Sequence, residues 1–420
     1  MNSISLFFAS LDPILFIEIL ESKLTISREK FTFKSASLAS ASGKNGNFVS
    51  DIYRLSIKFD LPGTDEQAID VIMKVSFDIV SEIKQLSVFR REQLMYEDMI
   101  KSFEGIWTEN GHDIIFAPKL YKVTEIPCEI IVLEDLKVDG YQMMSKKDGL
   151  DLEQTKLVLS KVAKFHAASA VRLVKDNKVI NHCFNRVATH VKHLPDSPII
   201  SSMQRLFNKL IQVAQTFSSD YSDKMTQWPL DILMDSYFDV AHPMKCGFMT
   251  LIHGDLWTNN ILFQEDSDGK SIDVKIIDYQ ISFWGSPNAD LIYLLFTSVM
   301  DDVKVKHFDE IIEFYYRELR MSLEMVKYGG YIPTVEELKD DLMDNRMYAN
   351  QLFPLIIPIT RNCSSTNLEI KDLFGGNLTE ETLNAVFMDE NVLKVIGSWL
   401  PFMYERGFLD IKCKENCKAK

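Results

Sequence analysis

Residues 253–263 read HGDLWTNNILF and residues 272–278 read IDVKIID, with a turn at Gly269 between them. Two apolar, β-prone runs on either side of a glycine-containing turn predict a β-hairpin. Asn260 and Asp278 lie nine residues before and nine residues after Gly269. Pairing of the two strands therefore brings the side chains of Asn260 and Asp278 together.

The polar residues around the hairpin predict a phosphoryl-transfer centre. An amide oxygen beside a carboxylate makes an oxygen-only site suited to Mg²⁺, which takes its other ligands from water and substrate phosphates. Asn260 and Asp278 are the predicted metal ligands, and Asp255, in the preceding loop, is the predicted acceptor of a proton from an attacking hydroxyl. Asp and Asn are common wherever a loop meets a strand. Three of them arranged about one turn favour a phosphotransferase.

A resemblance to a known family rests on three strings, LIHGDLWTNNILF, KIIDYQ and SPNADLIYLLFTS. They resemble the ecdysteroid-kinase-like small-molecule kinases of insects, a branch of the fold shared by aminoglycoside phosphotransferases and choline kinases. The resemblance implies an α+β, bilobal protein-kinase-like fold with a catalytic Asp255 and with Asn260 and Asp278 as metal ligands. Tyr279 and Gln280 stand where the family usually shows Phe-Gln, a departure that should not disturb metal binding.

A lysine and a glutamate nearer the N-terminus are predicted to pair. Strand alternation in the run VIMKV puts Lys74 on the face opposite Met73. In the following helix, Glu92 lies within an apolar stripe that includes Phe89 and Tyr96. A buried carboxylate needs a partner, and Lys74 would supply it. Such a pair holds the α- and β-phosphates of ATP in kinase folds, and the resemblance supports both positions.

Two further stretches are predicted to contact the nucleotide. The glycine-rich turn GKNGNF precedes the first long strand, where backbone amides could approach a triphosphate, although an ordinary hairpin turn is the alternative. The run IIVLEDL ends the predicted sheet, where this fold has a hinge whose backbone binds adenine; a buried strand that stops at a charged turn is the alternative. The predicted contacts in these stretches are Gly46, Asn47, Ser50, Glu134, Asp135 and Leu136.

The pattern along the chain changes from strand-rich to helical. A helix is predicted to begin near Asp12, and the stretch 35–46, rich in Ser, Ala and Gly, predicts a mobile loop. Asp151 and Gln154 predict a capping box at the start of the helical part. We expect an N-terminal lobe at residues 1–136 and a helical C-terminal lobe at 137–420. Strands are predicted at 48–59, 69–77, 114–124 and 129–135, and a helix at 81–103.

Composition excludes several classes of protein. The chain has 420 residues, 46% of them hydrophobic, enough to bury a substantial core. A net charge of −14 argues against a nucleic-acid binder. Six scattered cysteines without disulfide-rich or zinc-type spacing indicate reduced thiols in a cytoplasmic protein. No run of about 18 uncharged apolar residues occurs, so no membrane span is expected, and nothing indicates an obligate protein partner.

Three polar residues outside these motifs have mainly structural interpretations. His166 lies among small residues of a predicted helix and is interpreted as a hydrogen-bonded core histidine. Asp290 precedes an apolar helix and is predicted to cap it. By the resemblance, Asp290 also braces the loop of residues 253–260, which contains Asp255 and is called the catalytic loop below, through the loop's backbone. His253 is predicted to order the same loop by hydrogen-bonding to nearby backbone.

The acceptor is less well specified than the reaction, because phosphoryl transfer depends on positioning and charge neutralisation. The resemblance implies an ATP- and Mg²⁺-dependent enzyme acting on an ecdysteroid or a hydroxylated xenobiotic. A choline- or ethanolamine-type kinase and an inactive nucleotide-binding protein are the alternatives. Aromatic residues of the helical part would suit a flat hydrophobic acceptor, or they are simply core. They include Trp257, Phe283, Trp284, Phe353, Trp399 and Phe402.

Overall fold

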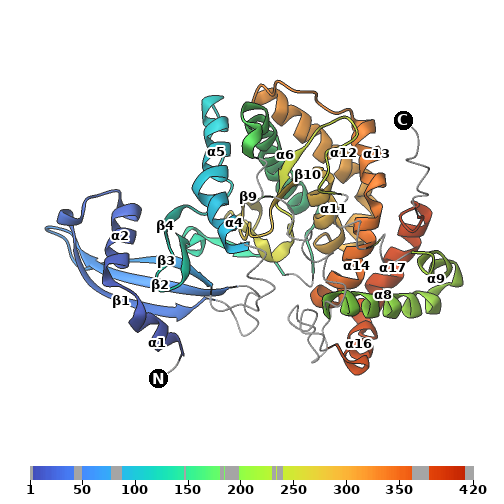
Figure 1. Ribbon diagram of the computed structural model, residues 1–420, viewed down its shortest axis with the longest axis horizontal. Coiled ribbons are helices and arrows are strands. Elements are labelled where there is room, and N and C mark those ends of the chain that lie inside the picture. The colour runs from blue at the N-terminus through green and yellow to red at the C-terminus, as the bar shows by residue number, and fades with distance from the viewer. Residues whose placement is uncertain are drawn as a thin grey trace.

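The computed structural model describes residues 3–41, 50–76, 88–145, 148–179, 184, 198–228, 233, 240–361 and 378–411. The fold is a bilobal, kinase-like α+β fold, as predicted, with a β-rich N-terminal region and a helical C-terminal region. In Figure 1 the large sheet lies at the left and most of the helices lie at the right, with one helix, α5 (Ile100–Glu109), upright between them.

The N-terminal region contains a five-stranded antiparallel sheet in the order β1-β2-β3-β5-β4. Its strands are β1 (Thr32–Ser40), β2 (Asp51–Asp60), β3 (Gln67–Ser76), β4 (Leu120–Thr124) and β5 (Glu129–Glu134). One face of β2, with Tyr53, Leu55 and Ile57, packs into a buried cluster with the N-terminal helices α1 (Ser3–Ser10) and α2 (Pro13–Leu24). The opposite face of the sheet carries Lys74.

Helix α2 begins where the sequence predicts. The carboxylate of Asp12 accepts a hydrogen bond of 2.9 Å from the backbone nitrogen of Ile14, and Pro13 occupies the first helical position. Proline is tolerated there because the first turn has no intrahelical partner for its nitrogen.

The prediction of a loop over residues 35–46 is wrong for residues 35–40, which belong to β1. This strand pairs with β2 in a register that sets Ser37 opposite Ser56. Its side chains are mostly exposed or half-buried. As an edge strand it is held by backbone pairing, so its small residues need not fill a core. Residues 42–49 lie outside the described residues.

The predicted strand at 114–124 is shorter than expected and begins at Leu120. Before that point the backbone is engaged elsewhere, since the Phe116 nitrogen donates to Glu104 and its carbonyl accepts from Ile276. The helix predicted at 81–103 is described from Val88, and residues 81–87 lie outside the described residues. It runs through α4 (Val88–Leu94), one π-helical turn (Met95–Met99) and α5, ending at Glu109.

The C-terminal region surrounds helix α11 (Asn288–Thr297), whose ten residues are all buried. A helix that is buried on every side, as this mostly apolar one is, lies in the centre of a core. Helix α6 (Leu152–Lys175) begins with the predicted capping box of Asp151 and Gln154. The other long helices are α8 (Pro198–Phe217), α12 (Asp301–Met325), α13 (Val335–Asp344), α14 (Arg346–Arg361), α16 (Glu380–Phe387) and α17 (Glu390–Glu405).

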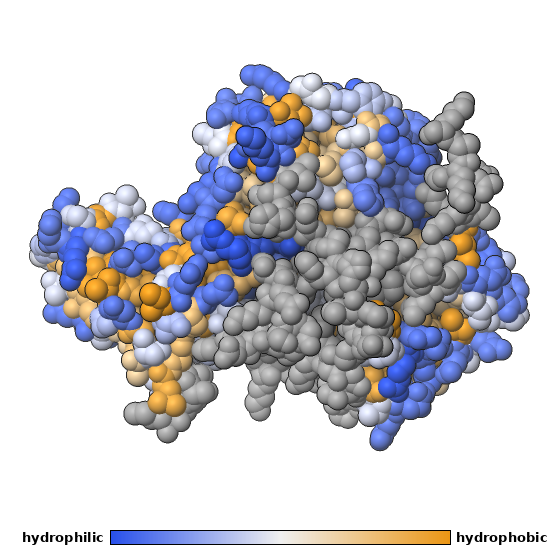
Figure 2. Space-filling view, viewed as in Figure 1, coloured by the Kyte–Doolittle hydropathy of each residue, from blue (hydrophilic) through white to orange (hydrophobic). Residues whose placement is uncertain are grey.

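Two small sheets complete this region. The strands β6 (Tyr141–Met143), β8 (Ile261–Glu265) and β9 (Ser271–Ile276) form one, and β7 (Thr250–Ile252) pairs with β10 (Phe283–Gly285) in the other. Within the described ranges, no helix is both long enough and apolar enough to cross a membrane. In Figure 2, hydrophobic residues gather over the N-terminal elements at the left, whereas hydrophilic residues cover most of the outer helices.

Candidate active site

The predicted hairpin forms and sets the spacing of the site. Strands β8 and β9 pair with Ile261 opposite Ile276. One residue beyond this pair, the Ile277 nitrogen donates to the Asn260 carbonyl at 2.9 Å. Asn260 and Asp278 therefore flank the open end of the hairpin. Asp278 has a positive φ of 67°, a conformation that non-glycine residues seldom adopt and that often marks functional sites.

Asn260 and Asp255 contact each other through the side chain of Asn260. The amide nitrogen Nδ2 of Asn260 lies 2.9 Å from the backbone oxygen of Asp255 and 2.9 Å from its carboxylate oxygen Oδ2. Because these contacts use the amide nitrogen, the amide oxygen Oδ1 is the atom that Asn260 can offer to a cation. The loop thereby joins the predicted catalytic residue to one predicted metal ligand.

Lys74 links the N-terminal sheet to the hairpin. Its ammonium lies 2.5 Å from a carboxylate oxygen of Glu92, so the predicted pair forms, and 2.7 Å from Oδ1 of Asp278. Burial lowers the pKa of Lys74, but the two carboxylates outweigh this effect and leave the pKa raised. Burial also raises the pKa of Glu92, to about 7, against the attraction of Lys74. The amine therefore stays charged between the buried carboxyl group of Glu92 and the half-buried carboxyl group of Asp278.

Asp255 also accepts a hydrogen bond that the sequence did not predict. The hydroxyl of Tyr293, on α11, donates to Oδ1 of Asp255 at 2.5 Å. Burial raises the pKa of Asp255, while hydrogen bonds from Tyr293 and Asn260 act in the opposite direction. A raised carboxylate pKa suits a group that accepts a proton during the reaction.

Asp290 holds the backbone of the catalytic loop. Its carboxylate accepts hydrogen bonds from the backbone nitrogens of His253 at 2.7 Å and Gly254 at 2.9 Å, and lies 3.1 Å from Nε2 of His166. Burial raises the pKa of Asp290, but interactions with His166, His253 and Gly254 leave it lowered, so the carboxylate is ionised. The predicted brace is confirmed. The predicted cap is wrong, because the helix already begins at Asn288 and this carboxylate faces the loop.

The two histidines have the predicted structural roles. His166 is fully buried, with Nδ1 2.7 Å from the Tyr315 hydroxyl. In His253, Nδ1 accepts from the backbone nitrogen of Asp255 at 3.2 Å, which leaves the hydrogen on Nε2 to bond to the Ile277 carbonyl at 2.9 Å. The ring of His253 therefore ties the catalytic loop to the end of the hairpin.

Gly254 allows this loop to pack closely. Its φ is +84°, and an added Cβ would lie 2.8 Å from the backbone oxygen of Ile281. Both the conformation and the space require glycine. Next to the loop, the Tyr279 ring is fully buried, with its centroid 4.8 Å from that of His253. Tyr279, which stands where the resemblance leads one to expect phenylalanine, is therefore a core residue.

The residues at the end of β5 use their side chains for protein contacts. The carboxylate of Asp135 pairs with Arg54 at 2.5 Å, and that of Glu134 lies 3.4 Å from Lys275. Leu136 is buried. Recognition of a base here would depend on backbone groups, in line with the sequence-based expectation.

Arg54 is a further residue that the sequence analysis missed. The register sets Arg54 of β2 opposite Ile72, two residues before Lys74, so Arg54 and Lys74 point to the same face of the sheet. Alternation with buried Tyr53 and Leu55 was the signal that could have found it. Ser50, just before β2, is buried, and its hydroxyl has no hydrogen-bond partner among the described residues. Gly46 and Asn47 lie outside those residues.

The six aromatic residues considered for the acceptor are all buried. Trp399 stacks on Phe353 with centroids 4.9 Å apart, and Trp284 donates a hydrogen bond to the Val179 carbonyl at 3.2 Å. These contacts favour their interpretation as core.

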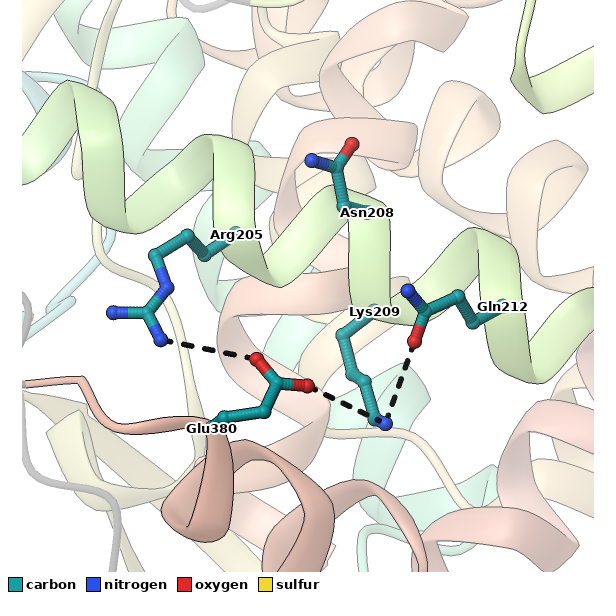
Figure 3. Close-up of a pocket in the computed structure, with 5 residues that line it drawn as sticks. All are labelled: Arg205, Asn208, Lys209, Gln212 and Glu380. Carbon is teal, nitrogen blue, oxygen red and sulfur yellow. Dashed lines mark hydrogen bonds and ion pairs between the residues drawn. The ribbon is translucent and has the colours of Figure 1, made fainter.

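A pocket of about 160 Å³ lies away from the predicted residues, between α8 and α16 (Figure 3). Arg205 and Lys209 point into it, and Glu380 lies 3.8 Å and 3.9 Å from them, respectively, so one carboxylate offsets half of their positive charge. None of the predicted site residues lines this pocket.

The oxygen atoms at the hairpin fit a magnesium ion. Across the described parts of the chain, no group of three or more His, Cys, Asp or Glu side chains is arranged to hold a metal. One amide oxygen and one carboxylate provide only a few protein ligands, and all of them are oxygen atoms. Mg²⁺ accepts such a set because water and phosphate oxygens complete its coordination. Asn260 and Asp278 would hold the ion.

This fold and constellation define a kinase-like phosphotransferase of the small-molecule class. The sequence model that describes the ecdysteroid kinase-like family matches residues 44–328 of this chain. This range includes every predicted site residue. The chain belongs to the ecdysteroid kinase-like family, and the resemblance inferred from its motifs is confirmed. A search of curated proteins found no match.

Proposed function

We propose that the protein is an ATP- and Mg²⁺-dependent kinase that phosphorylates a hydroxyl group of a small molecule, an ecdysteroid or a hydroxylated xenobiotic. The observation that carries this proposal is a pair of contact sets, Asp255 with Asn260 and Lys74 with Glu92 and Asp278. The backbone hydrogen bond from Ile277 to Asn260 holds the two sets at the same end of the hairpin. The family supplies the reaction class.

In the proposed reaction, the oxygen of the acceptor hydroxyl attacks the γ-phosphorus of ATP. The bond between that phosphorus and the β,γ-bridging oxygen breaks, and ADP leaves with the bonding electron pair. Asp255 orients the hydroxyl and accepts its proton. Lys74, held by Glu92, neutralises charge on the α- and β-phosphates. Mg²⁺, held by Asn260 and Asp278, would supply the remaining neutralisation of phosphate charge.

The proposal extends to the other parts of the site. Residues 1–136 would form the nucleotide-binding lobe and residues 137–420 the lobe that carries the acceptor. Gly46, Asn47 and Ser50 would contact the phosphates, and the backbone of residues 134–136 would bind adenine. The two described cysteines that are free thiols, Cys128 and Cys246, are compatible with the proposed cytoplasmic location.

Two alternatives remain distinct from this proposal. A choline- or ethanolamine-type kinase would use the same phosphoryl-transfer residues with a cationic acceptor. An inactive nucleotide-binding protein would retain ATP binding without turnover. The joint retention of Lys74, Glu92, Asp255, Asn260 and Asp278 favours an active enzyme over the second alternative.

The test is Mg²⁺-dependent release of ADP by the purified protein. The acceptors are a panel of ecdysteroids, hydroxylated plant and foreign compounds, choline, ethanolamine and an aminoglycoside. We expect stimulation by an ecdysteroid or a hydroxylated foreign compound and its loss in Asp255→Ala. Stimulation by choline alone would move the protein to the first alternative. ATP–Mg²⁺ binding without turnover across the panel would favour the second.

A further inference from the structure

Helix α11 contacts the catalytic loop at three positions. Asp290 binds the backbone of residues 253 and 254. The Ser298 hydroxyl, just after the last helical residue, accepts a hydrogen bond from the Thr258 nitrogen at 2.9 Å. Tyr293 lies between these two contacts and differs from both, because its hydroxyl reaches the reacting carboxylate itself.

The two oxygens of Asp255 are held from two different elements. Oδ1 accepts from the Tyr293 hydroxyl at 2.5 Å, and Oδ2 accepts from Nδ2 of Asn260 at 2.9 Å. A carboxylate turns about a single bond, so two donors on its two oxygens fix its plane. Each oxygen has a second lone pair, which leaves the carboxylate able to accept the proton of a bound alcohol.

The Tyr293 side chain is itself anchored. Only 6% of the residue is exposed, and it lies inside a helix whose residues are all buried. A short hydrogen bond to an ionised carboxylate is of the stronger, charge-assisted kind. The donor therefore comes from a rigid element, whereas the acceptor lies on a loop.

We propose that Tyr293 is a positioning residue that sets the orientation of Asp255 for attack by the acceptor hydroxyl. The inference rests on the proposed kinase function. Misplacing a group that must align with the attacking oxygen reduces turnover without weakening substrate binding. The expected signature is therefore a change in kcat alone.

Tyr293→Phe removes one oxygen atom and keeps the buried ring. We expect kcat for ADP release to fall by roughly ten- to a hundred-fold, below the full contribution of a general base. KM for ATP, KM for the acceptor and the Kd of ATP–Mg²⁺ should stay within about twofold of the wild-type values.

Tyr316→Phe is the matched control. Its hydroxyl is also buried and lies 2.8 Å from Oδ1 of Asn288 and 2.9 Å from the Leu338 carbonyl oxygen, either of which can accept its single hydrogen. This variant also loses a buried hydroxyl from the C-terminal region, yet it should keep the wild-type kcat. An equal fall of kcat in both variants would overturn the positioning role, since it would reflect general loss of packing.

A double variant separates action through Asp255 from other effects. In the Asp255→Ala background, Tyr293→Phe should lower the residual kcat no further, because the carboxylate that it orients is gone. Wild-type kcat in Tyr293→Phe, with Asp255→Ala still impaired, would overturn the inference and leave the kinase function standing. Absence of turnover in the wild-type protein across the acceptor panel would overturn the proposed function, and the inference with it.

Discussion

The two halves of the proposed active site are held in different ways. On the nucleotide side, charged residues from separate regions meet: Lys74 of the N-terminal sheet lies between Glu92 and Asp278. On the catalytic side, the Asp290 carboxylate and the Tyr293 hydroxyl of α11, with the Ser298 hydroxyl just after it, hold a loop of the same region. The first arrangement depends on a balance of charges, and the second depends on the packing of α11.

This difference predicts different responses to perturbation. Ion pairs that join residues distant in sequence are sensitive to charge and pH. Hydrogen bonds from a fully buried helix depend instead on whether the surrounding core stays folded. Variants on the nucleotide side should therefore change nucleotide affinity and the pH dependence of stability. Variants on the catalytic side should change turnover and the free energy of unfolding.

The largest effect is expected from Asp255→Ala. Its kcat should fall by roughly 10²–10⁴-fold, the usual contribution of a general base, while ATP–Mg²⁺ binding stays nearly intact. Steady-state ADP release and nucleotide titration would measure the two quantities. Asp266→Ala, in the exposed turn of the hairpin, is the control and should retain full turnover. Wild-type turnover in Asp255→Ala would exclude the proposed role.

Asp290→Ala should affect the catalytic side through stability. It leaves the backbone nitrogens of His253 and Gly254 and the ring of His166 without their acceptor. Loss of a buried, hydrogen-bonded charge typically costs about 3–5 kcal/mol in the free energy of unfolding. Denaturant unfolding would measure this cost.

The control for Asp290→Ala is Asp341→Ala. The Asp341 carboxylate accepts from the side chains of Ser286, Asn288 and Asn345, near the start of α11 and away from the catalytic loop. This variant should also be destabilised but should keep its kcat when folded. Equal turnover in the two folded variants would show that Asp290 does not shape the loop.

Asp278→Ala should affect the nucleotide side. The Kd of ATP–Mg²⁺ should rise by roughly 10- to 100-fold, since an interaction with a charged partner contributes about 1.5–3 kcal/mol. Without Mg²⁺, ATP binding should be unchanged or tighter, because one carboxylate no longer repels the phosphates. Calorimetric titrations with and without Mg²⁺ distinguish the two effects. Asp273→Ala, on the same hairpin but bonded to Tyr141 and Lys161, should leave the Mg²⁺ dependence unaltered.

The smallest effect concerns pH. Burial raises the pKa of Glu92 from 4.5 to about 7. The folded protein therefore holds a proton that the unfolded chain releases, and the resulting stability is present below pH 4.5 and lost as pH rises through 7. The free energy of unfolding should therefore fall between pH 5 and pH 8 in the wild type. In Glu92→Gln this fall should be smaller, by an amount on the order of 1 kcal/mol.

The lowered pKa of Asp290 gives the opposite dependence, with stability lost only as pH falls through the acidic range. A comparison of Asp290→Asn with the wild type between pH 5 and pH 8 should therefore show little pH-dependent difference. A slope for this pair as large as that for Glu92→Gln would contradict the division between the two sides.

The sequence predicted those features that follow from local periodicity. Turn chemistry around Gly269 predicted the hairpin, and strand alternation with an apolar helical stripe predicted the pairing of Lys74 with Glu92. Strand β1 was missed because its Ser- and Ala-rich residues carry no burial pattern, and backbone pairing at a sheet edge leaves none.

Contacts between distant residues were harder to predict. Tyr293 lies in the apolar run LIYLLF, where an aromatic residue is expected to be core, and its partner Asp255 is 38 residues away. Arg54 is 81 residues from Asp135, and nothing in either local sequence indicates the other. Asp290 was predicted as a cap because acids are common at helix starts, whereas its carboxylate faces a loop 36 residues earlier.

The position of α11 in the chain has a consequence for how the protein is made. Every residue proposed to touch the nucleotide or the metal precedes residue 279, but the helix that shapes the catalytic loop begins at Asn288. During synthesis, all residues of the catalytic loop are therefore made before the helix that holds the loop in place. A chain that stops at residue 287 would contain all of the reacting groups and still lack the element that arranges them.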